Sequence, residues 1–247
     1  MLRKLIKHEF IASYRRYVPF YIALLGLAVL NPLTSLTDDA FYINAILLSG
    51  AVIIVSVMSL FTIYNMIISL GRRVYGKPGY LLFTLPVKTI DIMLSKILVN
   101  LFWIICTVII SIITFAVTFY FFDGSFLTVF RMITLMFIEN PMDGLILILA
   151  LFIYALYSIA ILMFLFSFLN LIYKGERKIL MGLLIYFGMS IVIDSVYQIF
   201  ANYQDVSIDL LNSTTYIDWS FIGIYTLISS ILYISTYYMM DRSLELQ

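Results

Sequence analysis

Six long apolar runs divide this chain and determine what it can fold into. A helix needs about 20 predominantly apolar residues to cross the hydrocarbon core of a bilayer. Runs long enough cover residues 17–36, 43–70, 97–122, 144–173, 179–201 and 219–240. Because lipid offers no hydrogen bonds to the backbone, each run is predicted to be a helix. The sequence therefore predicts an all-α integral membrane protein, with one transmembrane domain of six spans over residues 1–247.

The composition excludes the other large classes of protein. The chain is 63% hydrophobic and 12% charged, whereas a soluble domain is about 45–50% apolar and about 25% charged. It holds one cysteine and one histidine, so neither an intrachain disulfide nor a zinc site of clustered ligands is expected. The net charge of +1 gives no indication of a nucleic-acid partner. We expect no catalytic residue, no metal and no cofactor in this chain.

The basic residues indicate how the spans are oriented. Six spans place both termini on the same side, and of the 15 lysines and arginines only Arg131 falls on the opposite side. Cytoplasmic loops of membrane proteins carry the excess of Lys and Arg, so both termini are predicted to be cytoplasmic. The acidic residues on the predicted outer side are Asp38, Asp39, Asp123, Glu139, Asp143, Asp205, Asp209 and Asp218.

The N-terminal segment 1–16 has the pattern of a basic amphipathic helix. Leu2, Leu5, Ile6 and Phe10 share one helical face, and most of the basic residues lie elsewhere. Such a helix is suited to lie along the cytoplasmic surface of a bilayer, in contact with lipid headgroups. The alternative is a charged flank that only fixes the topology.

The connection 71–96 between the second and third spans holds a short apolar element. Its start, Gly71-x-x-x-x-Gly76-Lys77, matches most of the consensus sequence of a phosphate-binding loop. Pro78, however, replaces the Ser or Thr that would hold magnesium. Pro78-Gly79 predicts a turn, and Pro86 ends the apolar stretch that follows it. A new helix is expected near Asp91. Exposed apolar surface of this kind indicates a docking site; the alternative is a loop folded back onto its own bundle.

The order of these features resembles a transporter family. A basic N-terminal helix, six spans and the motifs Gly79-Tyr80-Leu81, Thr84-Leu85-Pro86-Val87 and Leu94-Ser95-Lys96 are similar to permease subunits of ABC-2 type (type V) ABC exporters of Gram-positive bacteria. Exporters of amphipathic peptides such as phenol-soluble modulins are among them. The resemblance implies location in the bacterial cytoplasmic membrane and a coupling helix that docks on a separate ATPase, which would bind ATP and magnesium. By resemblance, the ATPase-coupling residues would be Gly79, Tyr80, Leu81, Leu82, Phe83, Thr84, Leu85 and Pro86.

Polar side chains inside the predicted spans have two interpretations. They hold helices together by hydrogen bonds, or they line a pathway for an amphipathic substrate. Asp194 is the most informative, because an acidic group within a bilayer usually faces a cavity or a partner. The residues that would line such a pathway are Asn100, Thr107, Ser111, Tyr154, Tyr157, Asp194, Gln198 and Tyr233.

These observations favour a transport subunit over an enzyme. Two copies of the chain, or one copy and a paralogue, would enclose a pathway for amphipathic peptides or lipid-like molecules, with a separate ATPase supplying the energy. The alternative is a six-span solute-binding subunit of an energy-coupling importer, which would need a polar solute pocket and small residues for docking a scaffold protein. An intramembrane enzyme is disfavoured because the chain has a single His, a single Cys and no clustered catalytic acids.

Overall fold

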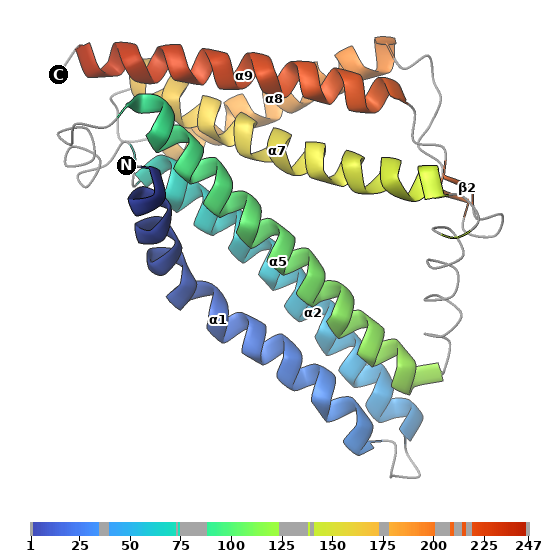
Figure 1. Cartoon of the computed structure of the whole chain (residues 1–247). Coiled ribbons are helices and arrows are strands. Elements are labelled where there is room, and N and C mark those ends of the chain that lie inside the picture. The colour runs from blue at the N-terminus through green and yellow to red at the C-terminus, as the bar shows by residue number, and fades with distance from the viewer. Residues whose placement is uncertain are drawn as a thin grey trace.

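The computed structural model describes residues 2–34, 40–72, 74, 88–123, 138, 141–172, 178–200, 208–209, 214–215 and 219–245. These residues form long helices and one short hairpin (Figure 1). The helices are α1 (Leu2–Thr34), α2 (Ala40–Ile67), α5 (Thr89–Asp123), α7 (Pro141–Ile172), α8 (Lys178–Phe200) and α9 (Trp219–Glu245), and a single π-helical turn, η1 (Ile68–Arg72), extends α2. Strands β1 (Ile208–Asp209) and β2 (Thr214–Thr215) pair antiparallel.

The helical architecture predicted from the apolar runs is confirmed, whereas the count of six membrane spans stays a prediction. Among the described residues, three helices are long and apolar enough to cross a membrane, over Thr89–Thr114, Gly144–Leu171 and Phe221–Asp241. Two shorter apolar stretches, Val55–Gly71 and Leu184–Ile199, lie in α2–η1 and α8. Large apolar side chains such as Leu60, Ile112 and Leu151 are exposed on the outside of the bundle, as expected where lipid replaces water as the solvent.

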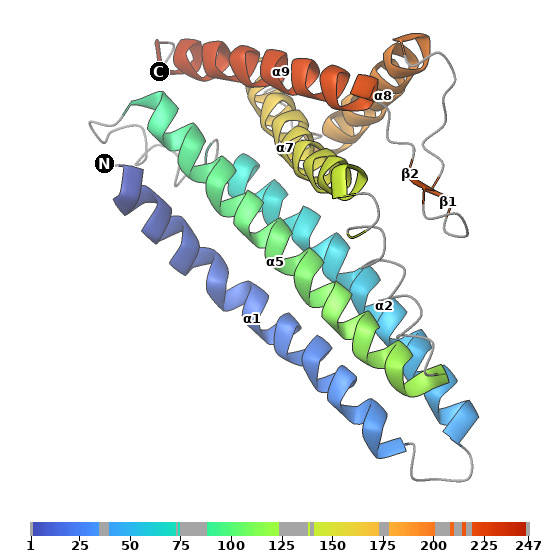
Figure 2. The ribbon, with the colours of Figure 1, turned by 45° about the vertical axis from the view of Figure 1, so that its right-hand side comes forward.

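The helices pack in two groups of three. Helices α1, α2 and α5 pack against one another, and α7 packs against both α8 and α9 (Figures 1 and 2). The groups meet where α7 contacts α5 and η1, and where α9 contacts α5. The N-terminal end of α1 and the C-terminal end of α9 lie at the same end of the molecule in both views.

An aromatic stack joins α1 to α5 in the first group. The Trp103 ring lies parallel to the Tyr17 ring at 4.4 Å between centroids, and it stacks on Phe10 at 5.2 Å. Phe10 and Tyr17 are two helical turns apart, so both rings project from one face of α1. Buried Leu24 and Met58 continue this core.

Helix α1 passes without a break through residue 16, where the predicted surface helix 1–16 would meet the first span. The reason lies in the same stack, because Phe10 on the N-terminal side and Tyr17 on the other pack against one tryptophan. The position of residues 2–16 relative to a membrane surface stays a prediction.

Candidate functional site

The predicted ATPase-coupling residues 79–86 lie outside the described residues, but both sides of that segment are described. Val74 before it and Ile92 after it are buried in one apolar cluster with Met240, against which Leu5 packs. We call these four residues the junction cluster. Leu5, Ile92 and Met240 come from α1, α5 and α9, and Val74 lies two residues beyond the end of η1. Val74 and Ile92, which flank the predicted coupling residues, are therefore both held in a contact shared with α1 and α9.

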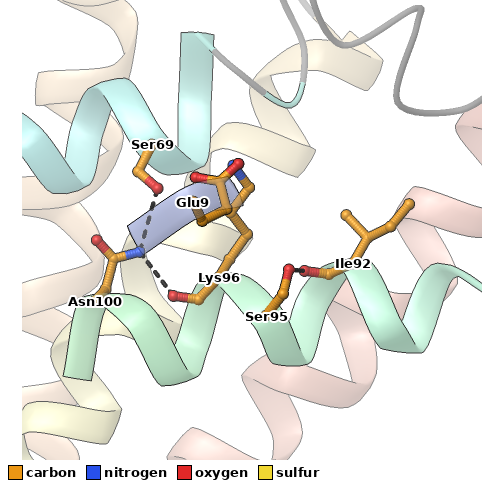
Figure 3. A network of polar contacts seen from close by, with 6 residues as sticks. All are labelled: Glu9, Ser69, Ile92, Ser95, Lys96 and Asn100. Carbon is orange, nitrogen blue, oxygen red and sulfur yellow. Dashed lines mark hydrogen bonds and ion pairs between the residues drawn. The ribbon is translucent and has the colours of Figure 1, made fainter. Parts of the chain in front are cut away.

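A buried ion pair joins α1 to α5 close to this cluster (Figure 3). The Lys96 Nζ donates a hydrogen bond to Glu9 Oε1 at 2.6 Å. The two side chains are only 2% and 9% exposed. Burying an ion pair costs solvation free energy, so each charge depends on its partner once it is inside. The pair therefore fixes the first turns of α1 against α5.

Hydrogen bonds extend this polar network to η1. The Asn100 Nδ2 donates to the Lys96 carbonyl oxygen at 2.8 Å and to Ser69 Oγ at 3.4 Å, as Figure 3 shows. The Ser95 Oγ donates to the Ile92 carbonyl at 2.7 Å. Asn100, predicted as a pathway residue, is thus buried between α5 and η1, where it helps to hold the helices together.

Sequence reasoning missed the Glu9–Lys96 pair. In the sequence, Lys96 stands out only as part of the family-like motif Leu94-Ser95-Lys96 and as one of the predicted cytoplasmic cations. The available signal was Glu9, the one acidic residue among the many basic residues of segment 1–16. A lone acid in a basic amphipathic segment is a reason to look for a cation elsewhere in the chain.

The other pathway candidates of the third span also lie within the first group of helices. The buried Thr107 donates from Oγ1 to the Trp103 carbonyl at 2.8 Å, and it shares a hydrogen bond with the Tyr21 hydroxyl of α1 at 2.9 Å. The Thr62 hydroxyl of α2 lies 3.4 Å from the same oxygen. Ser111 is half-buried one turn further along α5. These contacts favour helix packing over a pathway for this row.

Two pathway candidates of the second group, Tyr154 and Tyr157, pack against a tyrosine that the sequence did not single out. The Tyr225 ring of α9 contacts four other rings, with centroid distances of 4.4 Å to Phe221 and 4.9 Å to Tyr157. Tyr154 lies 6.1 Å and Tyr197 lies 5.9 Å from it. We call these five residues from α7, α8 and α9 the tyrosine cluster. Tyr157 and Tyr225 are buried, whereas Tyr154 is 52% exposed.

Asp194 of α8 lies beside the tyrosine cluster. It precedes Tyr197 of the cluster by three residues on α8, and its side chain is exposed, as is that of Gln198 one turn away. Tyr233 has a different role, because its hydroxyl donates to the Leu156 carbonyl of α7 at 2.7 Å and joins α9 to α7. The structure therefore brings Tyr154 and Tyr157 together, places Asp194 on the neighbouring helix α8, and leaves Asn100, Thr107 and Ser111 in the other helix group.

Comparisons with protein-family models, with curated proteins and with solved structures give no match to this chain. In the described part of the chain, no group of three His, Cys, Asp or Glu side chains is placed to hold one metal ion. The junction cluster, the polar network and the tyrosine cluster are therefore the features of this chain that bear on its function.

Proposed function

We propose that this chain is the transmembrane permease subunit of an ATP-driven ABC exporter, with six spans and both termini in the cytoplasm. The observation that carries the proposal is the junction cluster. Val74 and Ile92, on either side of the predicted ATPase-coupling residues 79–86, are both buried in one cluster with Met240 and Leu5. A force applied to residues 75–87 by a docked ATPase would therefore reach α1, α5 and α9 together.

The polar network supports this transmission of force. A loop that pulls on one helix end moves the bundle only if that end is firmly held by its neighbours. The Glu9–Lys96 pair and the Asn100–Ser69 hydrogen bond join the ends of α1, α5 and η1 at this place. Closure of an ATPase pair around ATP would then shift the bundle between inward-open and outward-open states, an equilibrium biased by nucleotide.

The assembly that fits this function is a dimer of two such chains, or of this chain and a paralogue, in the bacterial cytoplasmic membrane. Each copy would bind one ABC ATPase subunit through residues 79–86, and ATP and magnesium would be bound by that partner. The substrate would be an amphipathic peptide or a lipid-like molecule. The exposed apolar side chains of the described helices suit a pathway that is open to the surrounding lipid.

Co-purification tests the proposal. The chain, tagged at its C-terminus and expressed with the genes that neighbour its own, should bring down a stoichiometric subunit with magnesium-dependent ATPase activity. The double substitution Leu82→Asp, Phe83→Asp should release that subunit without changing membrane insertion. A matched control, Leu244→Asp with Leu246→Asp in the predicted cytoplasmic C-terminal segment, should retain it. If the chain comes out alone while the ATPase is expressed, the exporter proposal is wrong and the solute-binding alternative takes its place.

A further inference from the structure

A row of exposed apolar side chains follows one face of α5. Leu94, Leu98, Phe102 and Ile105 are 40–45% exposed, and their spacing of three or four residues places them on one side of the helix. The row lies in Thr89–Thr114, a stretch of α5 that is long and apolar enough to cross a membrane. Side chains of this kind on a span are expected to contact the acyl chains of lipids.

Helix α1 packs along α5 in a defined register. Glu9 of α1 pairs with Lys96 of α5, and further along both helices the Tyr21 hydroxyl shares a hydrogen bond with Thr107 Oγ1 at 2.9 Å. Because the contacts advance together along the two helices, the helices run parallel. Figures 1 and 2 show them side by side, with their first residues at the same end of the molecule. The first turns of α1 therefore lie beside the first turns of α5.

A ring contact shows which side of α1 meets the apolar row. The rings of Phe10 and Phe102, a member of the row, lie 5.2 Å apart between centroids. Arg3, Lys7 and Tyr14 share a face of α1 with Phe10, because they lie seven and three residues before it and four residues after it. All three side chains are exposed. Two cations therefore stand on the flank of α1 that adjoins the row, toward the starts of both helices.

The charge on this flank is mainly positive. Within the described residues, neither Arg3 nor Lys7 forms an ion pair or a side-chain hydrogen bond. Glu9, the acid of segment 1–16, is buried against Lys96. Asp91, seven residues before one member of the row, lies in the first turn of α5, where the positive end of the helix dipole compensates its charge. The two exposed cations of α1 are therefore available to an anion.

We propose that this flank of α1 and α5 binds one anionic phospholipid. Arg3 and Lys7 contact the phosphate of the headgroup, and an acyl chain lies along the apolar row of α5. Basic residues at the cytoplasmic ends of spans bind anionic headgroups in this way. The position of the row within a candidate span favours a lipid over a soluble protein as the occupant. The site rests on the predicted cytoplasmic position of the N-terminus and is independent of the exporter function.

Quenching of Trp103 by brominated lipid tests this site. The Trp103 ring lies 5.4 Å from the Phe102 ring between centroids, and in a Trp219→Phe background it is the one tryptophan of the chain. The full chain is placed in phosphatidylcholine nanodiscs with increasing fractions of brominated phosphatidylglycerol or brominated phosphatidylcholine. The mole fraction for half-maximal quenching should be at least about tenfold lower for phosphatidylglycerol. Equal mole fractions for the two lipids would overturn the proposal.

Charge variants decide whether Arg3 and Lys7 are responsible. Arg3→Gln with Lys7→Gln should lower the preference for phosphatidylglycerol at least about fivefold, whereas Arg3→Lys with Lys7→Arg should retain it. The matched control, Lys4→Gln with Arg15→Gln, removes two exposed cations that lie about 100° further round the helix. It should lower the preference less than about twofold. Equal losses in the two glutamine doubles would show a general attraction to the surface and would rule out a site.

Two further measurements identify the occupant. Inorganic phosphate should compete no more strongly than chloride at the same ionic strength, and stronger competition would assign the cations to a free anion instead of a lipid. Native mass spectrometry in detergent should find a single phosphatidylglycerol on the wild type and none on Arg3→Gln with Lys7→Gln. If this double keeps its lipid preference but releases the ATPase in the co-purification experiment, the flank docks that partner and the lipid proposal is wrong. Since no ATPase is present in the lipid assays, failure of the exporter proposal and failure of this site are separate results.

Discussion

Breaking the Glu9–Lys96 pair is expected to cost a large part of the stability of the first helix group. In Lys96→Met, the carboxylate of Glu9 stays in a site where its side chain is only 9% exposed and loses the cation 2.6 Å away. Removing one partner of a buried ion pair typically costs about 3–5 kcal/mol. Glu9→Leu should cost a similar amount, because the Lys96 side chain is 2% exposed. The double variant should recover most of the loss, since apolar residues of similar volume often replace a buried pair at little cost.

Tryptophan fluorescence measures this loss at the contact itself. The chain has two tryptophans, and in a Trp219→Phe background the remaining one, Trp103, stacks between α5 and α1. Unfolding by SDS in mixed micelles, followed by this signal, gives the free energy of unfolding for each variant. A double-substitution cycle of Glu9→Leu and Lys96→Met should show a coupling of at least about 2 kcal/mol. Lys7→Met, at an exposed lysine of α1, should change the stability by less than about 0.5 kcal/mol.

Two outcomes would refute this reasoning. If Lys96→Met and Glu9→Leu each change the free energy of unfolding no more than Lys7→Met does, the pair does not hold α1 on α5. If the two losses are large but simply add in the double variant, each residue acts through other contacts and the pair itself contributes nothing.

Two further substitutions test helix contacts by the same unfolding assay. A Cβ atom at Gly71 would lie 2.7 Å from the Phe166 ring, so Gly71→Ala should destabilise the chain by about 1–3 kcal/mol, whereas Gly26→Ala, where the space is open, should not. Tyr233→Phe removes a 2.7 Å hydrogen bond to a backbone carbonyl of α7 and should cost about 0.6–2 kcal/mol, whereas Tyr238→Phe, at a side chain that is 67% exposed, should be neutral.

The positions of the helices could be predicted from the sequence because they depend on local properties. The apolar run 97–122 lies inside α5 (Thr89–Asp123), and the helix start predicted near Asp91 agrees with Thr89. The run 179–201 matches α8 (Lys178–Phe200) within one residue at each end. Length, hydropathy and helix-breaking residues are properties of consecutive residues, so a single sequence contains enough information to place the long helices, although it did not predict η1 or the hairpin of β1 and β2.

The contacts between helices could not be predicted in the same way. Glu9 and Lys96 are far apart in the sequence, and nothing in the hydropathy of either segment says that α1 packs on α5. Tyr225 shows the same limit, because its position in α9 gives no reason to place it among rings from α7 and α8. Gly71 was explained as part of an incomplete phosphate-binding pattern, whereas the structure shows that it allows η1 to approach Phe166. Each of these roles depends on a neighbour that the local sequence does not contain.

Helix α9 connects the two candidate sites, and this suggests how they act together. Met240 of the junction cluster and Tyr225 of the tyrosine cluster lie on this one helix, about 22 Å apart along its axis at 1.5 Å per residue. A helix held by its neighbours moves as a unit, so a displacement at Met240 changes the contacts that Tyr225 makes with α7 and α8. Binding free energies at two linked sites are reciprocal. If the proposed ATPase changes the affinity of the chain for its substrate, the substrate must change the affinity for the ATPase by the same factor.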